Sequence, residues 1–282
     1  MRVVHTVAEL RREVAQWRAR GETVALTPTM GNLHAGHLEL VERARSEADR
    51  VVATVFVNPL QFGPNEDFDR YPRTLTDDRA RLEAAGCDLL FAPSIDEMYP
   101  HGRQGIASVS VPGLSSILEG EFRPGFFEGV ATVVSILFHQ VQPDVAVFGR
   151  KDYQQLLVVR RMVQELHMPL RIVGNPTRRE PDGLAMSSRN QYLSPEERQL
   201  APSLHRALSA VAQRLKAGER DFDALTAEAR RMLDRQGFKT QYLVVRDPDT
   251  LGMPSVDNSA WVILVAAHLG RTRLIDNLEV SG

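Results

Sequence analysis

Short apolar segments alternate with longer amphipathic ones along the first part of the chain. The short segments, in which nearly every residue is apolar, are expected to form strands at residues 2–5, 23–28, 51–57, 88–93, 107–111, 144–149 and 170–174. The longer segments, in which apolar residues recur at helical spacing, lie at 7–21, after residue 34, and at 76–86, 129–141 and 152–166. Because strands that are apolar on both faces need cover on both sides, this alternation predicts an α/β fold with a mostly parallel sheet.

The order of elements changes after about residue 176. Two polar, arginine-rich helices are expected at about 195–217 and 222–236, followed by strands at 241–246, 261–269 and 272–276. Helices followed by strands indicate a small α+β domain. The sequence therefore predicts a Rossmann-like nucleotide-binding domain over residues 1–176 and a small α+β domain over residues 177–282, with the polar loop 177–190 at their junction.

Composition narrows the class of protein. The chain has 282 residues, of which 43% are hydrophobic and 25% charged, as in ordinary globular proteins and unlike disordered ones. No apolar run is long enough to span a membrane, and the charged N-terminus does not resemble a secretory signal. The single cysteine, Cys87, cannot form an internal disulfide and fits a reducing compartment. With a net charge of −2, a surface that coats nucleic acid is not expected, and a cytoplasmic enzyme is the leading class.

The segment TPTMGNLHAGH, residues 27–37, carries the first candidate chemistry. It leaves a predicted strand, turns at Gly31 and enters a predicted helix, at the sheet edge where open α/β folds bind ligands. His34 and His37 share one face of that helix, where imidazoles and backbone N–H groups can bind phosphate oxygens. Gly36 between them would let a nucleotide approach the backbone closely. The alternatives are two surface histidines at a helix start, or one half of a metal site.

A second group of polar residues follows the predicted strand 51–57. Asn58 and Gln61 carry neutral amides, which suit a substrate with hydroxyls and a carboxylate, although an ordinary loop is the alternative. Asp77 and Asp78 are candidates for a metal site, but the pattern favours a cap on the next helix.

A third group lies in FGRKDYQQL, residues 148–156, where another predicted strand enters a helix. Lys151 is positioned for phosphate, Asp152 for a hydroxyl or a helix cap, and Gln155 for a second polar contact. The alternative is a capped helix with a lysine in solvent.

The loop at the domain junction carries the fourth group, AMSSRN, residues 185–190. Ser187, Ser188 and Arg189 could form a phosphate clamp, because a guanidinium can follow a leaving diphosphate. The alternative is a polar linker. Four such groups at the positions expected for one nucleotide site support each other.

Together these segments resemble the pantoate–β-alanine ligase family. PTMGNLHAGH, VNPLQF, YPRT, FGRKDYQQL and MSSRNQYL occur in the order and spacing of the family, and the resemblance covers essentially the whole chain. HAGH and MSSR are also similar to the signature pair of nucleotidyltransferases and class I aminoacyl-tRNA synthetases. VNPLQF and the glutamine-rich helix after Lys151 indicate the ligase.

The resemblance implies a two-step ligation. ATP and (R)-pantoate would form pantoyl adenylate and diphosphate, and the amine of β-alanine would then displace AMP to give pantothenate, the precursor of coenzyme A. His37 would be the main catalytic residue, with His34, Lys151 and Arg189 as its partners. The expected ATP site consists of Met30, Gly31, Asn32, Leu33, His34, Ala35, Gly36, His37, Gly149, Arg150, Lys151, Asp152, Arg178, Met186, Ser187, Ser188 and Arg189.

The resemblance also implies the rest of the site and its partners. Gln61, Gln155 and Asn58 would bind pantoate, and Gln61 would also border β-alanine. A Mg²⁺ ion would help to neutralise the triphosphate, and the domain 177–282 would act as a lid. The family implies a homodimer, with no nucleic acid or membrane as partner.

Three positions depart from the family pattern. The family commonly has Glu at Arg150, His at Phe126 and an apolar residue at Arg178. A contact made through the backbone would tolerate Arg178, but Phe126 cannot donate the hydrogen bond that a histidine would donate.

Three other functions compete with the ligase. They are a different nucleotidyltransferase of the same fold such as a cytidylyltransferase, a tRNA-charging enzyme, and a nucleotide-binding regulator without turnover. The tRNA enzyme is disfavoured by the length and charge of the chain. A pure binder would not need both histidines, Lys151 and the MSSR loop together.

Overall fold

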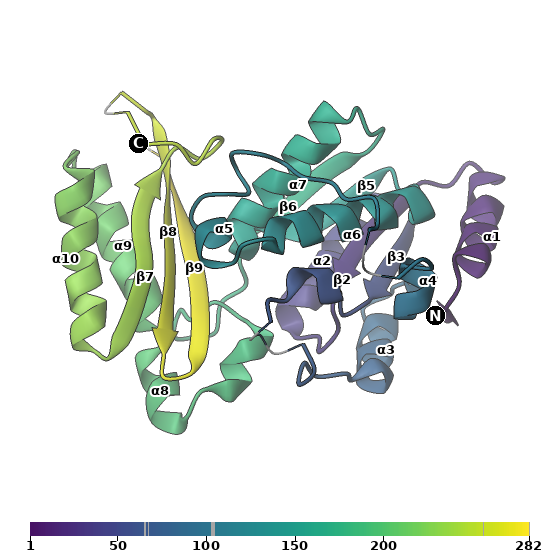
Figure 1. Ribbon diagram of the computed structural model, residues 1–282, viewed down its shortest axis with the longest axis horizontal. Coiled ribbons are helices and arrows are strands. Elements are labelled where there is room, and N and C mark those ends of the chain that lie inside the picture. The colour runs from purple at the N-terminus through teal and green to yellow at the C-terminus, as the bar shows by residue number, and fades with distance from the viewer. Residues whose placement is uncertain (65, 67, 103–104, 256, 282) are drawn as a thin grey trace. The chain divides into compact units, whose positions relative to one another are not determined.

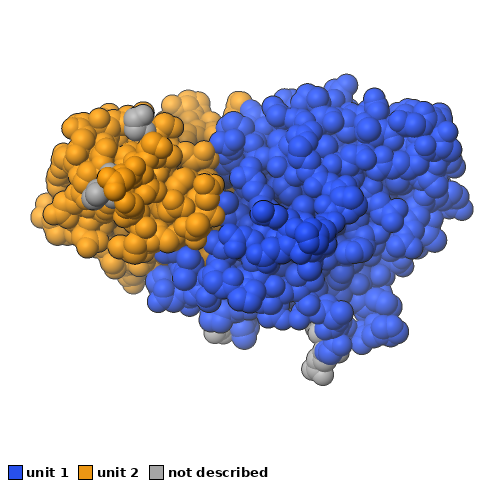
Figure 2. Space-filling view, turned by 90° about the horizontal axis from the view of Figure 1, so that it is seen from above, with its two compact units in different colours: residues 1–150, 155–176 blue, residues 151–154, 177–282 orange. Residues whose placement is uncertain are grey.

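A computed structural model describes residues 1–64, 66, 68–102, 105–255 and 257–281. The chain divides into two compact units, which Figure 2 distinguishes by colour. The first unit comprises Met1–Arg150 and Gln155–Pro176, and the second comprises Lys151–Gln154 and Thr177–Gly282. The second unit thus takes in a short segment that follows Arg150.

Parallel strands form the sheet of the first unit (Figure 1). Its six strands within the described residues are β1 (Arg2–Val4), β2 (Val24–Thr29), β3 (Arg50–Val55), β4 (Leu89–Phe91), β5 (Val145–Gly149) and β6 (Arg171–Asn175). Their order across the sheet is β1-β4-β3-β2-β5-β6. The chain therefore builds the sheet in one direction from β2 to β4 and in the other from β5 to β6.

Helices connect these strands. They are α1 (Val7–Arg18), α2 (Ala35–Arg45), α3 (Leu75–Ala84), α4 (Ile95–Met98), α5 (Glu119–Phe122), α6 (Phe126–Val141) and α7 (Tyr153–Glu165), with the 3-10 turns η1 (Pro59–Gln61) and η2 (Arg150–Asp152). On one face of the sheet, Leu40 of α2 and Leu82 of α3 share an apolar cluster with Val147 of β5. On the other face, Phe138 of α6 contacts Phe148, the neighbour of Val147. Helices thus cover both faces, as the apolar strands require.

The prediction of a strand at 107–111 is wrong. This segment belongs to no strand, and the backbone N–H of Val109 donates to Thr132 Oγ1 of α6 at 2.9 Å. Val111 is buried while Ser108 and Ser110 are exposed. The alternation of apolar and polar residues therefore reflects one buried side of an extended segment.

Helices and an antiparallel sheet form the second unit. In the described residues this sheet has the strand order β7 (Phe238–Arg246), β8 (Ala260–Leu269) and β9 (Thr272–Ser281). The helical elements are η3 (Ser188–Tyr192), α8 (Pro195–Leu200), α9 (Ser203–Lys216) and α10 (Phe222–Arg235). The two-part fold class is thus confirmed: a parallel α/β part is followed by a small α+β part.

Several boundaries in the second unit differ from prediction, among them the start of β7 at Phe238 instead of residue 241, and two of the differences have a physical reason. The single helix expected at 195–217 is divided at Pro202, which precedes α9 and has no N–H with which to continue α8. The last strand runs to Ser281 instead of ending at residue 276, because its pairing with β8 continues to Ala260. None of the described helices combines the length and the hydropathy needed to cross a bilayer.

Candidate active site

The point where the sheet reverses its direction of growth positions the first and the third motif. β2 and β5 are neighbours, with Ala25 paired with Val145, yet the chain leaves β2 toward β3 and leaves β5 toward β6. Open α/β sheets bind ligands at the carboxyl ends of such a strand pair. The segment 27–37 leaves the carboxyl end of β2, and Gly149 ends β5 while Arg150 begins η2. The fold therefore brings these predicted site segments to one sheet edge.

A tight turn connects β2 to α2. Gly31 and Asn32 both adopt the left-handed region, with φ of 83° and 50°. A Cβ atom on Gly31 would lie 2.9 Å from Asp78 Oδ2, so both the dihedral angle and the available space require glycine. The turn directs the backbone N–H groups at the start of α2 to the carboxyl edge of the sheet, where the helix dipole favours an anion.

His34 and His37 lie together at the start of α2. His34 is the N-cap residue, and its Nδ1 accepts the Gly36 N–H at 3.2 Å. The Nδ1 atom of His37 accepts the His34 N–H at 3.3 Å, and the two ring centroids are 4.0 Å apart. Because Nδ1 accepts in each ring, the proton of each neutral imidazole is on Nε2. The pair therefore combines a helix N-terminus with two potential donor nitrogens.

Gln61 connects the second motif to the first. Its Nε2 atom lies 3.2 Å from Met30 Sδ, and its Oε1 atom accepts from Asn58 Nδ2 at 3.0 Å. Asn58 is 1% exposed, and its Nδ2 also donates to the Gly129 carbonyl oxygen at 3.1 Å. Its Oδ1 accepts from the Tyr99 hydroxyl at 2.7 Å. Asn58 therefore orients the Gln61 amide from inside the protein.

Tyr99 and Gly129 support this arrangement from other elements. Burial raises the pKa of Tyr99, so its hydroxyl keeps the proton that it donates to Asn58. A Cβ atom on Gly129 would lie 2.3 Å from the Leu60 carbonyl oxygen and 2.9 Å from the Gln61 backbone nitrogen. Only a glycine allows α6 and η1 to approach this closely.

Arg123 contacts η1, the turn that carries Gln61. Its guanidinium donates to both carboxylate oxygens of Glu66, at 2.7 and 2.6 Å, and to the Gln61 carbonyl oxygen at 3.1 Å. Burial disfavours the charged form, but the carboxylates of Glu66 and Glu119 outweigh it and raise the pKa of Arg123. The ring of Phe126 lies over the guanidinium at 3.7 Å. Phe126 thus makes a cation–π contact in place of the hydrogen bonds that a histidine would make.

The second unit holds the predicted site residues of the loop 177–190. The loop 177–190 is ordered by a β-bridge between Arg179 and Ala185, and the Met186 N–H donates to the Arg178 carbonyl oxygen at 2.9 Å. Arg179 forms a bidentate ion pair with Asp276, at 2.7 and 3.0 Å. In the turn that follows, Ser187 Oγ accepts the Arg189 N–H at 3.3 Å, and Asn190 Nδ2 donates to the Ala185 carbonyl oxygen at 3.1 Å. The junction loop is therefore an ordered element of the second unit.

The predicted residues of the third motif are divided between the two units. Lys151 Nζ lies 3.8 Å from Asp152 Oδ2, and the Lys151 carbonyl oxygen accepts from Asn277 Nδ2 at 2.8 Å, all within the second unit. Arg150 donates to the Gly174 carbonyl oxygen at 3.2 Å, and Gln155 is half-buried on α7, both in the first unit.

The metal candidates and the cysteine also have defined surroundings. Asp77 is exposed, whereas Asp78 is buried and accepts the N–H groups of Asn32 and Leu33. Within the described part of the chain, no cluster of three or more His, Cys, Asp or Glu side chains could hold a metal ion. Burial raises the pKa of Cys87 to about 12, so its thiol is neutral at physiological pH and is a poor nucleophile.

Comparison with known proteins identifies the family. The family model described as pantoate-beta-alanine ligase matches residues 2–279. The chain belongs to the pantoate–β-alanine ligase family. It is 56% identical over 281 residues to the pantothenate synthetase of Pseudomonas savastanoi pv. phaseolicola, covering 100% of this chain and 99% of that protein. It is 57% identical over 281 residues to the enzyme of that name from Thioalkalivibrio sulfidiphilus, covering 100% and 98%.

Solved structures of the ligase family share the fold. The pantothenate synthetase of Thermus thermophilus is 53% identical, with a TM-score of 0.91 and full coverage of both chains. The pantoate-beta-alanine ligase of Francisella tularensis is 31% identical, with a TM-score of 0.81, and covers 99% of this chain and 97% of that one. That structure was solved as a complex with beta-gamma ATP and beta-alanine.

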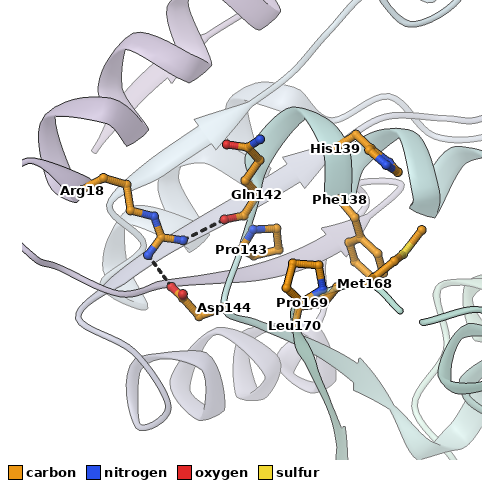
Figure 3. A pocket seen from close by; sticks show the side chains of 9 residues that line it. All are labelled: Arg18, Phe138, His139, Gln142, Pro143, Asp144, Met168, Pro169 and Leu170. Carbon is orange, nitrogen blue, oxygen red and sulfur yellow. Dashed lines mark hydrogen bonds and ion pairs between the residues drawn. The ribbon is translucent and has the colours of Figure 1, made fainter. Parts of the chain in front are cut away.

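A cavity of about 360 Å³ lies elsewhere in the first unit of this ligase-family chain (Figure 3). It is lined by residues that precede β5 and β6, among them Pro143, Asp144 and Pro169, and by Phe138 near the end of α6. The guanidinium of Arg18 donates to Asp144 at 2.6 Å at its border. The cavity is therefore at the amino ends of the strands, at the edge opposite to the candidate active site, and no predicted site residue lines it.

Proposed function

We propose that this member of the ligase family condenses (R)-pantoate with β-alanine at the expense of ATP and releases pantothenate, AMP and diphosphate. The observation that carries the proposal is the His34–His37 pair at the N-terminus of α2, which follows β2 through the turn that begins at Met30, the residue that Gln61 contacts. A helix N-terminus and paired imidazoles suit a polyphosphate, and an amide 3.2 Å from Met30 suits the second substrate next to it.

In the first step, the pantoate carboxylate attacks the α-phosphorus of ATP and diphosphate leaves. Negative charge grows on the phosphoryl oxygens, and donors aimed at that charge lower the barrier. The Nε2 protons of His34 and His37 and the N–H groups of α2 supply such donors. Lys151 and Arg189 would add positive charge. In the second step, the amine of β-alanine attacks the acyl carbon of pantoyl adenylate and AMP leaves.

Neither step requires a nucleophile from the protein. The attacking groups are a carboxylate and an amine of the substrates, and the one cysteine of the chain keeps its proton. Gln61 and Gln155 would hold pantoate by its hydroxyl and carboxylate groups. Asn58 would act on pantoate through Gln61, because its own amide is already bonded within the protein.

Three further parts of the proposal concern Mg²⁺, assembly and location. A carboxylate site for Mg²⁺ at Asp77 and Asp78 does not fit the geometry, because both oxygens of Asp78 accept backbone N–H groups. We therefore infer Mg²⁺ only as the counter-ion of ATP, to which it binds through phosphate oxygens and water. We also propose a homodimer, which the family implies, and a cytoplasmic location, which a single buried thiol favours. Light scattering of the purified protein tests the dimer.

Exchange of labelled diphosphate into ATP tests the function. Under the proposal the exchange requires (R)-pantoate and not β-alanine, since it reports the first step alone. A nucleotidyltransferase with another substrate would need that other acceptor, and a nucleotide-binding regulator would show no exchange. In a folded His37→Ala protein the exchange should be lost, and near-normal exchange would remove His37 from the mechanism.

The fate of the carboxylate oxygens tests the mechanism. When pantoate carries heavy oxygen in its carboxylate, one labelled atom should appear in AMP and the other should remain in the new amide. Label in inorganic phosphate, or ADP as the nucleotide product, would show that an acyl phosphate forms instead and would refute the adenylate route.

A further inference from the structure

Side chains of α3 hold the turn between β2 and α2. The carboxylate of Asp78 accepts the Asn32 N–H at 3.0 Å through Oδ2 and the Leu33 N–H at 2.8 Å through Oδ1. Arg81, one helical turn further on, donates through Nη1 to the Leu33 carbonyl oxygen. The backbone around Leu33 is therefore fixed through both its donor and its acceptor group.

Asp78 does not cap the N-terminus of its own helix, α3. Thr74 is the N-cap residue of α3, and no side chain caps that end with a hydrogen bond. The Thr74 hydroxyl donates instead to Asp78 Oδ2, at 3.1 Å. Asp78 is 1% exposed, and a carboxylate this deeply buried is stable only with several donors. The donors that it has belong mainly to the turn at residues 31–33.

The turn needs such support because its backbone is strained. Asn32 has a φ of 50°, a conformation that residues other than glycine adopt at a cost in energy. Gly31 before it brings the backbone so close that Asp78 Oδ2 would touch a Cβ atom at 2.9 Å. The next residue after Leu33 is His34, the N-cap of α2. The orientation of the turn therefore decides where α2 begins and where its histidines lie.

We propose that Asp78, assisted by Arg81, is a positioning residue for ATP. It holds the turn at residues 31–33 and thereby sets the N-terminus of α2 and the His34–His37 pair against the polyphosphate. The inference rests on the proposed function of these histidines. It also assigns Asp78 a role other than metal binding or helix capping.

Asp78→Asn tests the inference, and Asp77→Asn is its matched control. An asparagine side chain has only one oxygen acceptor, and its NH₂ group would face the second of the two backbone N–H groups, of Asn32 and Leu33, that the carboxylate accepts. That backbone N–H would then have no acceptor. The KM for ATP should rise about 10- to 100-fold, as expected when a buried hydrogen bond to the turn is lost. The KM for pantoate and the Mg²⁺ concentration that gives half-maximal rate should change less than twofold. Asp77 is exposed, and Asp77→Asn should behave as wild type.

Arg81→Gln is the second variant, because Arg81 is exposed and its replacement spares the core. It should raise the KM for ATP in the same direction, with a smaller change. Amide hydrogen exchange at Asn32 and Leu33, measured without substrates, should become faster in Asp78→Asn and remain unchanged in Asp77→Asn. This measurement distinguishes the hold on the turn from any loss of overall fold, since amides of β5 serve as the internal reference.

Three outcomes would overturn the inference. A folded Asp78→Asn protein with a wild-type KM for ATP would show that the turn needs no hold. Equal increases in the KM for pantoate and ATP would indicate general loosening. A raised Mg²⁺ requirement in both Asp77→Asn and Asp78→Asn would indicate a metal site. Failure of the wild-type protein to form pantothenate would refute the proposed function instead, while the exchange rates would still test the hold on the turn.

Discussion

Gly129 provides a sharp test of how the candidate substrate site is built, because two effects of Gly129→Ala oppose each other. In the interior of an exposed helix, alanine is more favourable than glycine by about 1 kcal/mol. At this position the added methyl group would lie 2.3 Å from the Leu60 carbonyl oxygen, whereas a carbon–oxygen contact is normally at least about 3.3 Å. Either α6 or η1 must therefore move by about 1 Å.

The movement affects two hydrogen bonds that orient Gln61. Asn58 Nδ2 donates to both the Gly129 carbonyl oxygen and Gln61 Oε1. Separating α6 from η1 therefore weakens both hydrogen bonds at once. Overpacking of this kind costs about 1–3 kcal/mol, which offsets or exceeds the gain in helix propensity. A displacement of about 1 Å in a group that orients substrate can lower the rate by about 100-fold. We expect kcat/KM for pantoate to fall about 10- to 100-fold, with the KM for ATP nearly unchanged.

The assay couples AMP formation to NADH oxidation over a range of pantoate concentrations, with thermal unfolding measured in parallel. Glu128→Ala is the control, since it places alanine on the exposed side of the same helical turn. Gly129→Ala should be less stable than Glu128→Ala and defective with pantoate. If Gly129→Ala raises the melting temperature and leaves kcat/KM for pantoate unchanged, the close packing of α6 on η1 does not position Gln61.

Two other predictions concern charge. Arg123→Met removes the shared partner of two largely buried ion pairs, with Glu66 and Glu119. The free energy of unfolding should therefore fall by about 3 kcal/mol, and the KM for pantoate should rise. An unchanged midpoint of urea unfolding would contradict this prediction. His205 in the second unit has a pKa below 6.5, because burial and the charge of Arg179 outweigh the attraction of Asp276. The unfolded chain therefore binds more protons below pH 6.5, and stability should decrease as the pH falls from about 7 to 5. This slope should be smaller in His205→Asn, and an identical slope would exclude His205 as its source.

The sequence predicts well those features that depend on local pattern. The strands β2, β3 and β5 lie where short apolar runs place them, because a strand buried on both faces has no polar positions. The first two motifs meet one sheet edge for the same reason, since parallel strands share a carboxyl end. The predicted helix begins at residue 129, so Gly129 is its first residue, and the pattern gives no sign of the close approach to η1 that Gly129 makes within α6.

Contacts between distant segments could not be predicted in this way. The hydrogen bond from Tyr99 to Asn58 joins residues 41 positions apart in the sequence, and the ion pair of Arg179 with Asp276 joins residues 97 positions apart. No local pattern predicts either contact. The segment 107–111 shows that a local pattern can also predict a strand where there is none. Its alternation is the same whether a neighbouring strand or the Thr132 hydroxyl bonds Val109, so pattern alone cannot distinguish the two.

The histidine pair shows how structure decides between chemical alternatives that spacing leaves open. Two histidines three residues apart fit a phosphate clamp, half of a metal site, or two surface histidines at a helix start. A histidine that ligates a metal through Nε2 must carry its proton on Nδ1, where it donates to a second group. In this protein the Nδ1 atoms of His34 and His37 instead accept backbone N–H groups, at 3.2 and 3.3 Å. The proton of each neutral ring is then on Nε2, where it blocks a metal and suits an anion, so the geometry favours the phosphate site that the proposed reaction requires.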